Sequence, residues 1–328
     1  MLLDKTEIKF ANQAIYKGDA KWGESNNWYW QGIRCNWRLL GKQNKRPILL
    51  LHGFGASSDH WRHNAQPLAS AGYRVYGLDL IGFGDSEQPT KKKIPKLDNE
   101  IWSKQVADFL EAVVQTKSFG KAILIGNSLG GLTALTTVCF HPELVSAVIA
   151  APLPDPALMQ PSKLSKPFWW TKLRDQLATV FFQLLPLEIL IPLISRTGLI
   201  RIALQAAYHH SIKFDRTLLK LVAKPAQKPT AARALRAMCI GMSTRRKEIT
   251  APELLNELQK RVNRTPFLMI WGKQDKLVPL QISKKLLIQY PWLNLVVFDK
   301  TGHCPHDESP KQFNEKVLKW LNTNLGEN

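Results

Sequence analysis

Short apolar runs alternate with amphipathic stretches along most of the chain, and this alternation predicts a sheet with helices packed on it. Apolar runs that end in turn residues predict strands at 46–52, 73–81, 123–126, 144–150, 265–272 and 293–298, after a tryptophan-rich hairpin at 27–41. Helical periodicity follows at 59–72, 98–116, 129–138, 280–289 and 311–321. Strands separated by helices in this way are typical of a mostly parallel sheet covered on both faces.

One long segment interrupts the alternation. About 115 residues separate the strand at 144–150 from the strand at 265–272, whereas a crossover between parallel strands needs far fewer. We therefore predict an inserted helical cap over the carboxyl ends of the strands, where open α/β sheets bind their ligands. The chain accordingly divides into a first part of the core at 1–152, a cap at 153–264 and a second part of the core at 265–328.

Positive charge is concentrated on the predicted cap. The 328 residues carry a net charge of +19, and residues 162–264 alone hold 19 Lys and Arg against six Asp and Glu. The same segment contains the stretches KPFWWTKL (166–173) and LATVFFQLLPLEILIPLI (177–194). Aromatic and aliphatic residues flanked by bases suit contact with an anionic membrane surface. A cap helix packed on the core, with solvated bases, is the alternative, and no motif that reads nucleic acid accompanies the charge.

The cysteines and the apolar segments bear on compartment and cofactors. The four cysteines, Cys35, Cys139, Cys239 and Cys304, lack any metal-binding spacing, which predicts free thiols in a reducing compartment and no metal or other cofactor. The first residues, MLLDKTEIKFANQ, lack the apolar segment of a signal peptide. Two prolines and a glutamate interrupt the most apolar window, 177–194, so no membrane-spanning helix is predicted. We expect a location on the cytoplasmic side.

The stretch ILIGNSLGGLTALTTV (123–138) carries the strongest chemical signal. Its residues 126–130 fit the pattern G-x-S-x-G, which forms a nucleophile elbow where a strand turns sharply into a helix. Such a turn forces Ser128 into a strained conformation, and a side chain at position 126 or 130 would collide with neighbouring backbone. The turn raises the Ser128 hydroxyl above the sheet edge, so Ser128 is the predicted nucleophile.

A serine hydroxyl needs a base, and the base needs an orienting acid. In the order that this elbow implies, the acid and the histidine follow the serine. His303, in the loop after the last predicted strand, is the expected base, and His306 is its competitor. Asp275, after the penultimate strand, is the expected acid, and Asp155 in the proline-rich segment is the alternative.

Two backbone amides are the expected donors to an oxyanion. The Leu129 amide lies at the start of the helix after the elbow, and the Phe54 amide lies in the loop HGFG (52–55) after the first long strand. We interpret His52 in the same loop as a buried, hydrogen-bonded structural residue. Asp79 and Asp85 precede the serine and are interpreted as turn or capping residues.

Four motifs together resemble those of the α/β-hydrolase-fold superfamily, over nearly the whole chain. They are LLLHGFGASSDHW (49–61), LDLIGFGDS (78–86), GNSLGG (126–131) and TGHCPHDESP (301–310). Within the superfamily, HGFGASSDHW, GHCPHDE and the early WYWQGIRCNW (28–37) are most similar to the chlorophyll dephytylase and pheophytinase branch. The cap is the least similar region.

This resemblance implies an α/β-hydrolase fold with an inserted helical cap, and a serine esterase that removes phytol from chlorophyll or pheophytin. Ser128 would attack the ester carbonyl, His303 would move the proton, Asp275 would steady the imidazolium, and the Phe54 and Leu129 amides would bind the oxyanion. Water would then hydrolyse the acyl-enzyme. The basic cap would bring the enzyme to a thylakoid-type membrane, and the lack of a transit-peptide pattern favours a cyanobacterial source.

Three alternatives remain open at this point. A carbon–carbon bond hydrolase of aromatic ring-cleavage products shares HGxG and GNSxGG and uses the same three residue types. A generic lipid carboxylesterase is the second alternative, and a pigment-binding carrier on the same fold is the third. Dehalogenases and epoxide hydrolases use an aspartate nucleophile, so Ser128 disfavours both.

Overall fold

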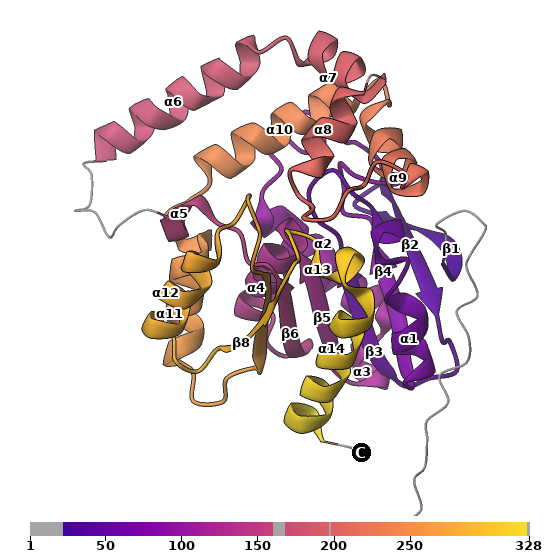
Figure 1. Ribbon diagram of the computed structural model, residues 1–328. Helices are drawn as coiled ribbons and strands as arrows, with labels where there is room; N and C mark the ends of the chain where they lie inside the picture. The colour runs from indigo at the N-terminus through magenta and orange to yellow at the C-terminus, as the bar shows by residue number, and fades with distance from the viewer. Residues whose placement is uncertain (1–21, 160–167, 197, 327–328) are drawn as a thin grey trace, which may run out of the picture.

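An eight-stranded sheet organises the residues that the computed structural model describes, which are 22–159, 168–196 and 198–326 (Figure 1). The strand order is β1-β2-β4-β3-β5-β6-β7-β8, and only β2 among the described strands runs against its neighbours. The predicted, mostly parallel sheet is therefore confirmed. The strands are β1 Glu24–Trp30, β2 Ile33–Leu40, β3 Arg46–Leu51, β4 Tyr73–Leu78, β5 Ala122–Asn127, β6 Val145–Ala151, β7 Phe267–Gly272 and β8 Asn294–Phe298.

Helices cover both faces of this sheet, as the uninterrupted apolar strands predict. In β3, Leu49 and Leu51 point into one buried cluster, while Ile48 and Leu50 point into another on the opposite face. The first cluster is closed by α2 Asn99–Phe109, α4 Leu129–Phe140, α11 Ala251–Lys260 and α12 Leu280–Gln289. The second is closed by α1 Ala65–Ser70 and α14 Pro310–Leu325.

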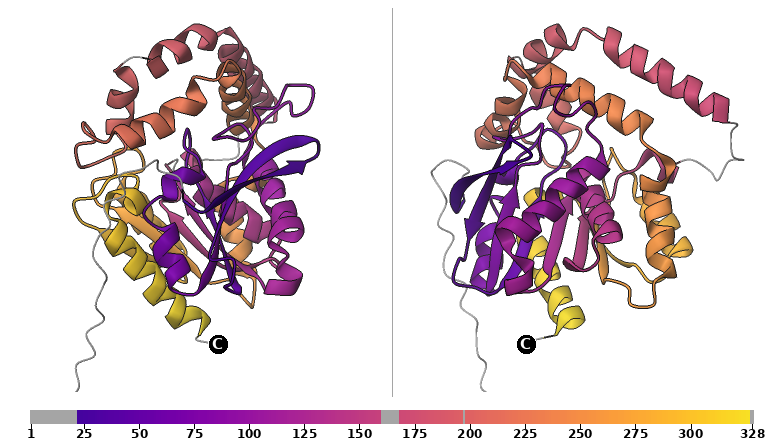
Figure 2. Two further views of the ribbon diagram at one scale, coloured as in Figure 1. Left: turned by 90° about the vertical axis from the view of Figure 1, so that its right-hand side faces the viewer. Right: turned by 180° about the vertical axis from the view of Figure 1, so that it is seen from behind.

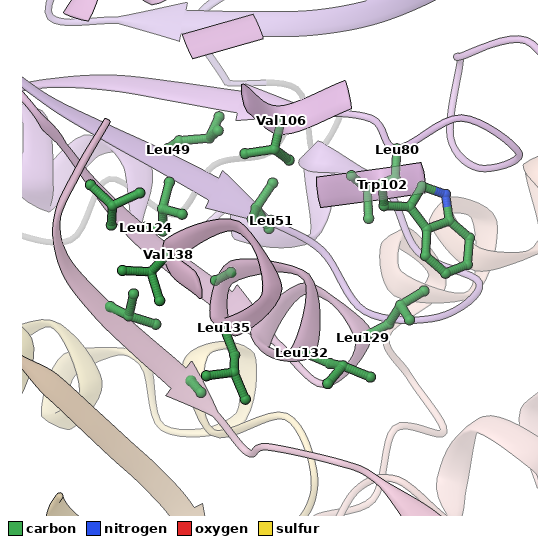
Figure 3. Packing of buried hydrophobic residues seen from close by; sticks show 14 of the residues in the cluster. Leu49, Leu51, Leu80, Trp102, Val106, Leu124, Leu129, Leu132, Leu135 and Val138 are labelled. Carbon is green, nitrogen blue, oxygen red and sulfur yellow. The ribbon is translucent and has the colours of Figure 1, made fainter. Parts of the chain in front are cut away.

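The packing of α4 against β3, β5 and α2 fixes the height of the elbow above the sheet. Leu132, Leu135 and Val138 lie on α4 beside Leu51 and Leu124 of the sheet (Figure 3). These side chains are at most 1 % exposed, and each buried leucine or valine contributes about 1.5–3 kcal/mol relative to exposure. The start of α4 is therefore held rigidly at the carboxyl end of β5.

Short helical turns connect or extend these elements. A 3₁₀ turn, η1 Ser58–Trp61, follows the β3 loop, and a π-helical turn, η2 Leu110–Val114, extends α2. The Asp98 side chain caps α2 by accepting hydrogen bonds from the Glu100 and Ile101 amides. The remaining short helices of the core are α3 Thr116–Phe119 and α13 Pro305–Glu308.

A layer of helices lies over the carboxyl ends of the strands, at the top of Figure 1. It contains α6 Phe168–Leu184, α7 Leu187–Arg196, α8 Leu199–Gln205, α9 Arg216–Ala226 and α10 Ala231–Thr244, with α5 Pro156–Met159 before it and η3 Lys247–Ile249 after it. Both views of Figure 2 show the same layer above the sheet. We use the word cap for α6 to α10.

The predicted cap segment, 153–264, extends further than this layer. Leu254, Leu255 and Leu258 of α11 are buried in the same cluster as the sheet residues. Helix α11 therefore packs with the core, and the residues that cover the strand ends finish with α10. The amphipathic pattern of α11 is the same whether its apolar face meets the sheet or other cap helices, so periodicity did not separate the two cases.

Candidate active site

Ser128 sits at the sharp turn between β5 and α4, with backbone angles φ 50° and ψ −116°. A Cβ atom on Gly126 would lie 2.2 Å from the carbonyl carbon of Gly130, and one on Gly130 would lie 2.2 Å from the Leu51 carbonyl oxygen. Real Cβ atoms do not approach backbone this closely, so both positions require glycine. The turn stores strain at Ser128 and presents its hydroxyl above the sheet.

The structure brings Ser128, His303 and Asp275 into one hydrogen-bonded line. Ser128 Oγ lies 2.8 Å from His303 Nε2, and His303 Nδ1 lies 2.9 Å from Asp275 Oδ2. The His303 and Asp275 side chains are buried. With Nδ1–H donating to the carboxylate, Nε2 is free to accept the serine proton. This arrangement can activate a hydroxyl for attack on a carbonyl carbon.

The loops after β7 and β8 hold the acid and the base in place. Asp275 Oδ1 accepts hydrogen bonds from the Leu277 and Val278 amides at 2.8 and 2.9 Å, which leaves Oδ2 for His303. A Cβ atom on Gly272, at the end of β7, would lie 2.0 Å from the Gly302 carbonyl oxygen. The two loops touch through backbone, so the separation of Asp275 and His303 is set by the sheet.

The two alternative residues lie elsewhere in the hydrogen-bond network. Asp155 forms a 2.5 Å ion pair with Arg245 and accepts a hydrogen bond from the Ala251 amide, so it ties the segment after β6 to the start of α11. His306 is fully buried against Trp61, with ring centroids 4.2 Å apart. Burial holds the pKa of His306 well below its usual range. Neither side chain makes a contact that would let it replace Asp275 or His303.

The HGFG loop lies directly beside the elbow. A Cβ atom on Gly53 would lie 3.4 Å from the Ser128 Cβ atom. His52 Nε2 accepts a hydrogen bond from the Leu80 amide, so its proton is on Nδ1, which donates to the Gly53 carbonyl oxygen at 2.8 Å. His52 is thus buried and structural, as predicted. Within the described residues, the Phe54 and Leu129 amides donate to no acceptor.

The comparisons with known proteins agree with this geometry. The chain matches the alpha/beta hydrolase fold family over residues 46–310. The chain belongs to this family. It is 25% identical, over 88% of its length and 91% of the relative, to a 2-hydroxy-6-oxononadienedioate/2-hydroxy-6-oxononatrienedioate hydrolase of Burkholderia vietnamiensis. It is 28% identical to the chloroplastic pheophytinase of Arabidopsis thaliana, over 88% of this chain and 64% of that protein.

A solved structure shares the fold of this α/β-hydrolase. The serine hydrolase involved in carbazole degradation (CarC enzyme) superposes with a TM-score of 0.67 at 22% identity, covering 92% of this chain and 99% of that one. At this identity the likeness establishes the fold alone. The relatives named above are hydrolases of the α/β family that act on different bonds, so the comparisons leave the substrate to the chemistry of the cavity.

An apolar cavity of about 430 Å³ opens between the core and the cap of this α/β-hydrolase. Ser128 and His303 lie in its wall together with Phe54 and Phe83 of the core. The cap contributes mostly aliphatic side chains, which are Ile191, Ile194, Ile200, Leu204, Val222 and Leu235. Neither lysine nor arginine lines the cavity within the described part of the chain.

A buried polar cluster joins the cap to the histidine loop. Arg62 donates hydrogen bonds to both Asp215, at the start of α9, and Asp307, four residues after His303. The Tyr208 hydroxyl donates to Asp307 Oδ2 and accepts from His60 Nε2. Burial lowers the pKa of His60 to about 4. The burial of Asp307 is outweighed by His60 and Arg62, which hold its pKa below the usual range.

Sequence reasoning missed this cluster and a second positioning residue, Asn127. The Asn127 amide group donates to the Ala151 carbonyl oxygen at 2.5 Å and to the His303 carbonyl oxygen at 3.2 Å. Asn127 therefore links the elbow to the loop that carries the base. It occupies the variable position of G-x-S-x-G, and Asp307 stands inside GHCPHDE, so only the motifs themselves drew attention to these positions.

Metal sites were searched in residues 22–159, 168–196 and 198–326. No three histidine, cysteine, aspartate or glutamate side chains lie close enough together there to hold a metal ion. The four cysteines are free thiols, and Cys35, Cys139 and Cys304 are buried. Burial raises the pKa of Cys35 to about 11 and that of Cys139 to about 12. These thiols are therefore protonated and poorly nucleophilic at neutral pH.

Proposed function

We propose that this α/β-hydrolase is a serine esterase that cleaves esters of long apolar groups, and that its substrate is the phytyl ester of chlorophyll or pheophytin. The observation that carries the proposal is the hydrogen-bonded pair of Ser128 and His303 in the wall of an apolar cavity of about 430 Å³. The similarity to the Arabidopsis pheophytinase supports the choice of a phytylated pigment.

The proposed reaction uses five groups of this chain. Ser128 Oγ attacks the ester carbonyl while His303 Nε2 takes its proton, and Asp275 stabilises the imidazolium that forms. The Phe54 and Leu129 amides donate to the oxyanion of the tetrahedral intermediate. His303 then protonates the departing phytol oxygen, which leaves the pigment acid bound as an ester of Ser128. Water, deprotonated by His303, hydrolyses that ester and restores the enzyme.

The lining of the cavity favours an apolar ester over a ring-cleavage product. The substrate named for the Burkholderia relative is a dioate, which carries two carboxylates. Burying a carboxylate without a charged partner is strongly unfavourable, and the described lining has no lysine or arginine to pair with one. His60, which does line the cavity, has a pKa near 4 because it is buried, so it is uncharged at neutral pH.

The test of the proposed function compares substrates in detergent micelles, so that no membrane is involved. Chlorophyll a, pheophytin a, p-nitrophenyl palmitate, p-nitrophenyl acetate and a ring-fission dienoate are each incubated with the protein, and free phytol is measured by gas chromatography. We expect phytol release at a much higher kcat/KM than acetate hydrolysis. Hydrolysis of palmitate without phytol release would leave a generic lipid esterase, and rapid cleavage of the dienoate would favour the carbon–carbon hydrolase.

A fluorophosphonate probe separates an enzyme from a pigment carrier. We expect the probe to label Ser128, because the adjacent imidazole activates the hydroxyl. The Ser128→Ala variant is the matched control and should not label. Binding of pigment without labelling of the wild-type protein would assign the chain to the carrier class.

A further inference from the structure

Helix α6 turns its apolar face away from the protein. Leu173, Leu177, Val180, Phe181 and Leu184 recur at the spacing that places them on one side of a helix. Leu177, Phe181 and Leu184 are 61, 58 and 77% exposed. In a helix that only covers a core, this side would be buried.

The opposite side of α6 explains this orientation. Asp175, Ala178, Thr179 and Phe182 are partly buried there, and Arg236 of α10 donates to the Phe182 carbonyl oxygen at 3.0 Å. Figure 1 shows α6 as the outermost helix of the cap, running over α10 and beyond it. The less apolar side therefore packs on the cap, and the large apolar side chains are left on the outer surface, where contiguous apolar patches mark interaction sites.

Helix α7 continues this surface and joins it to the cavity. Ile189 and Leu193 are exposed on α7, while Ile191 and Ile194 of the same helix line the cavity that holds Ser128. One short helix thus separates the outer apolar surface from the interior of the site. We call the side chains Leu173, Leu177, Val180, Phe181, Leu184, Ile189 and Leu193 the outer apolar face.

The charges around this face are those of a surface for an anionic partner. Lys172 and Arg201 are exposed on α6 and α8. The acids of α6 and α7 are both matched by arginine, since Asp175 lies 2.7 Å from Arg174 and Glu188 lies 2.5 Å from Arg236. Unpaired positive charge therefore remains beside the apolar side chains. Lys163 and Lys166, which add to the charge of the sequence, lie outside the described residues.

The helix lengths and the bend between them favour an in-plane contact. No single described helix is long and apolar enough to cross a bilayer. The segments Lys172–Leu184 and Leu187–Ser195 have the required length and composition only together, and a bend of 60° lies between them. Apolar helices with basic flanks of this kind lie in the headgroup region, with the bases at the lipid phosphates.

We propose that the outer apolar face docks on an anionic lipid bilayer, with α6 and α7 in the interface, and that the apolar ester enters the cavity past α7 from the bilayer. This inference rests on the proposed function for the identity of the ester only. An ester with a long hydrocarbon chain partitions into the bilayer rather than into water. A site that opens beside the membrane receives such a substrate without exposing it to water.

The experiment measures binding of the full chain to vesicles by co-sedimentation. The probes are vesicles of phosphatidylglycerol with phosphatidylcholine and vesicles of phosphatidylcholine alone, each at 50 and 500 mM NaCl. We expect binding to the anionic vesicles at low salt and weaker, but persisting, binding at high salt, because salt screens the bases and leaves apolar insertion intact. Absence of binding to anionic vesicles at low salt would overturn the proposal.

The decisive variant is Leu177→Ser with Phe181→Ser and Leu184→Ser. We expect at least a tenfold loss of vesicle binding at 500 mM NaCl and of turnover of vesicle-embedded ester, with hydrolysis of p-nitrophenyl acetate unchanged within twofold. The matched control is Val262→Ser with Ile288→Ser, since these aliphatic residues of the core are 94 and 83% exposed. The control should bind as the wild type does, and equal losses in both variants would reject the assignment to this face.

Two further readouts complete the test. Lys172→Glu with Arg201→Glu should remove most of the salt-dependent part of the binding, and an unchanged salt dependence would overturn the role of these bases. If the protein instead forms a dimer that the serine variant dissolves, and no vesicle binding occurs, the face is an interface between two copies. Circular dichroism verifies the fold of each variant. Vesicle binding without phytol release would uphold the docking surface and reject only the pigment as substrate.

Discussion

The loops around Ser128 and the cap helices above them are built on opposite principles. At the strand ends, backbone meets backbone so closely that Gly126, Gly130 and Gly272 admit no side chain. In the outer part of the cap, α6 rests on α10 and presents leucine and phenylalanine to the outside. The first region fixes the position of every reacting group, whereas the second leaves apolar surface for something outside the chain. The chemistry therefore belongs to the core, and access to it belongs to the cap.

The largest effect should come from the reacting groups of the core. Ser128→Ala, His303→Ala and Asp275→Asn should each lower kcat by about 10⁴-fold, and a double variant should lose little more, because such residues act as a unit. Steady-state kinetics on p-nitrophenyl acetate measures this. Asp155→Asn, which disturbs an ion pair away from Ser128, is the matched control. A full loss in the control with near-normal activity of Asp275→Asn would reverse the assignment of the acid.

A second prediction compares one glycine from each region. Gly130→Ala should lower kcat/KM by about 10²-fold, since the new Cβ atom would lie 2.2 Å from the Leu51 carbonyl oxygen and must displace the elbow by a fraction of an ångström or more. Gly198→Ala, at the start of α8, meets no atom within 4 Å, and its φ of −60° suits alanine. It should leave kcat/KM and the melting temperature almost unchanged. Similar losses in both variants would contradict the rigid core and tolerant cap.

These two regions also differ in what the sequence alone could establish. The elbow at Ser128, the loop of His303 and the helix Leu280–Gln289 follow from local patterns, because a tight turn and an amphipathic period are written in consecutive residues. The bridge from Arg62 to Asp215 and Asp307 joins residues 153 and 245 positions apart. No local pattern specifies such pairs. The outward direction of the α6 apolar side and the packing of α11 on the core were hidden for the same reason.

A third prediction narrows the cavity from the cap side. Ala203 of α8 lines the cavity, and it is exposed enough to accept a larger side chain. Ala203→Trp should lower kcat/KM for p-nitrophenyl palmitate by about tenfold, in line with the 1–3 kcal/mol that pocket shape contributes to specificity. The value for p-nitrophenyl acetate should stay within twofold. Ala206→Trp, exposed and outside the cavity lining, is the control, and an equal loss there would mean that the variant disturbs α8 rather than the cavity.

The smallest expected effect concerns the polar cluster where the two regions meet. Burial lowers the pKa of His60 from 6.5 to about 4, and within the described residues its Nδ1 atom has no hydrogen-bond partner that could stabilise the charged ring. Between these pH values the unfolded chain binds more protons at this position than the folded one. The free energy of unfolding therefore falls as the pH decreases through this window.

Between pH 7 and 5.5 the contribution of His60 should decrease by about 1 kcal/mol, since one pKa unit corresponds to about 1.4 kcal/mol. Urea unfolding at both pH values measures this for the wild type and for His60→Gln, which keeps a donor toward Tyr208 but does not titrate. His63 and His306 also have pKa values lowered by burial and act in the same direction, so the difference between the two proteins isolates His60. An equal decrease in both proteins would show that His60 is protonated without cost, and that the junction of core and cap admits water.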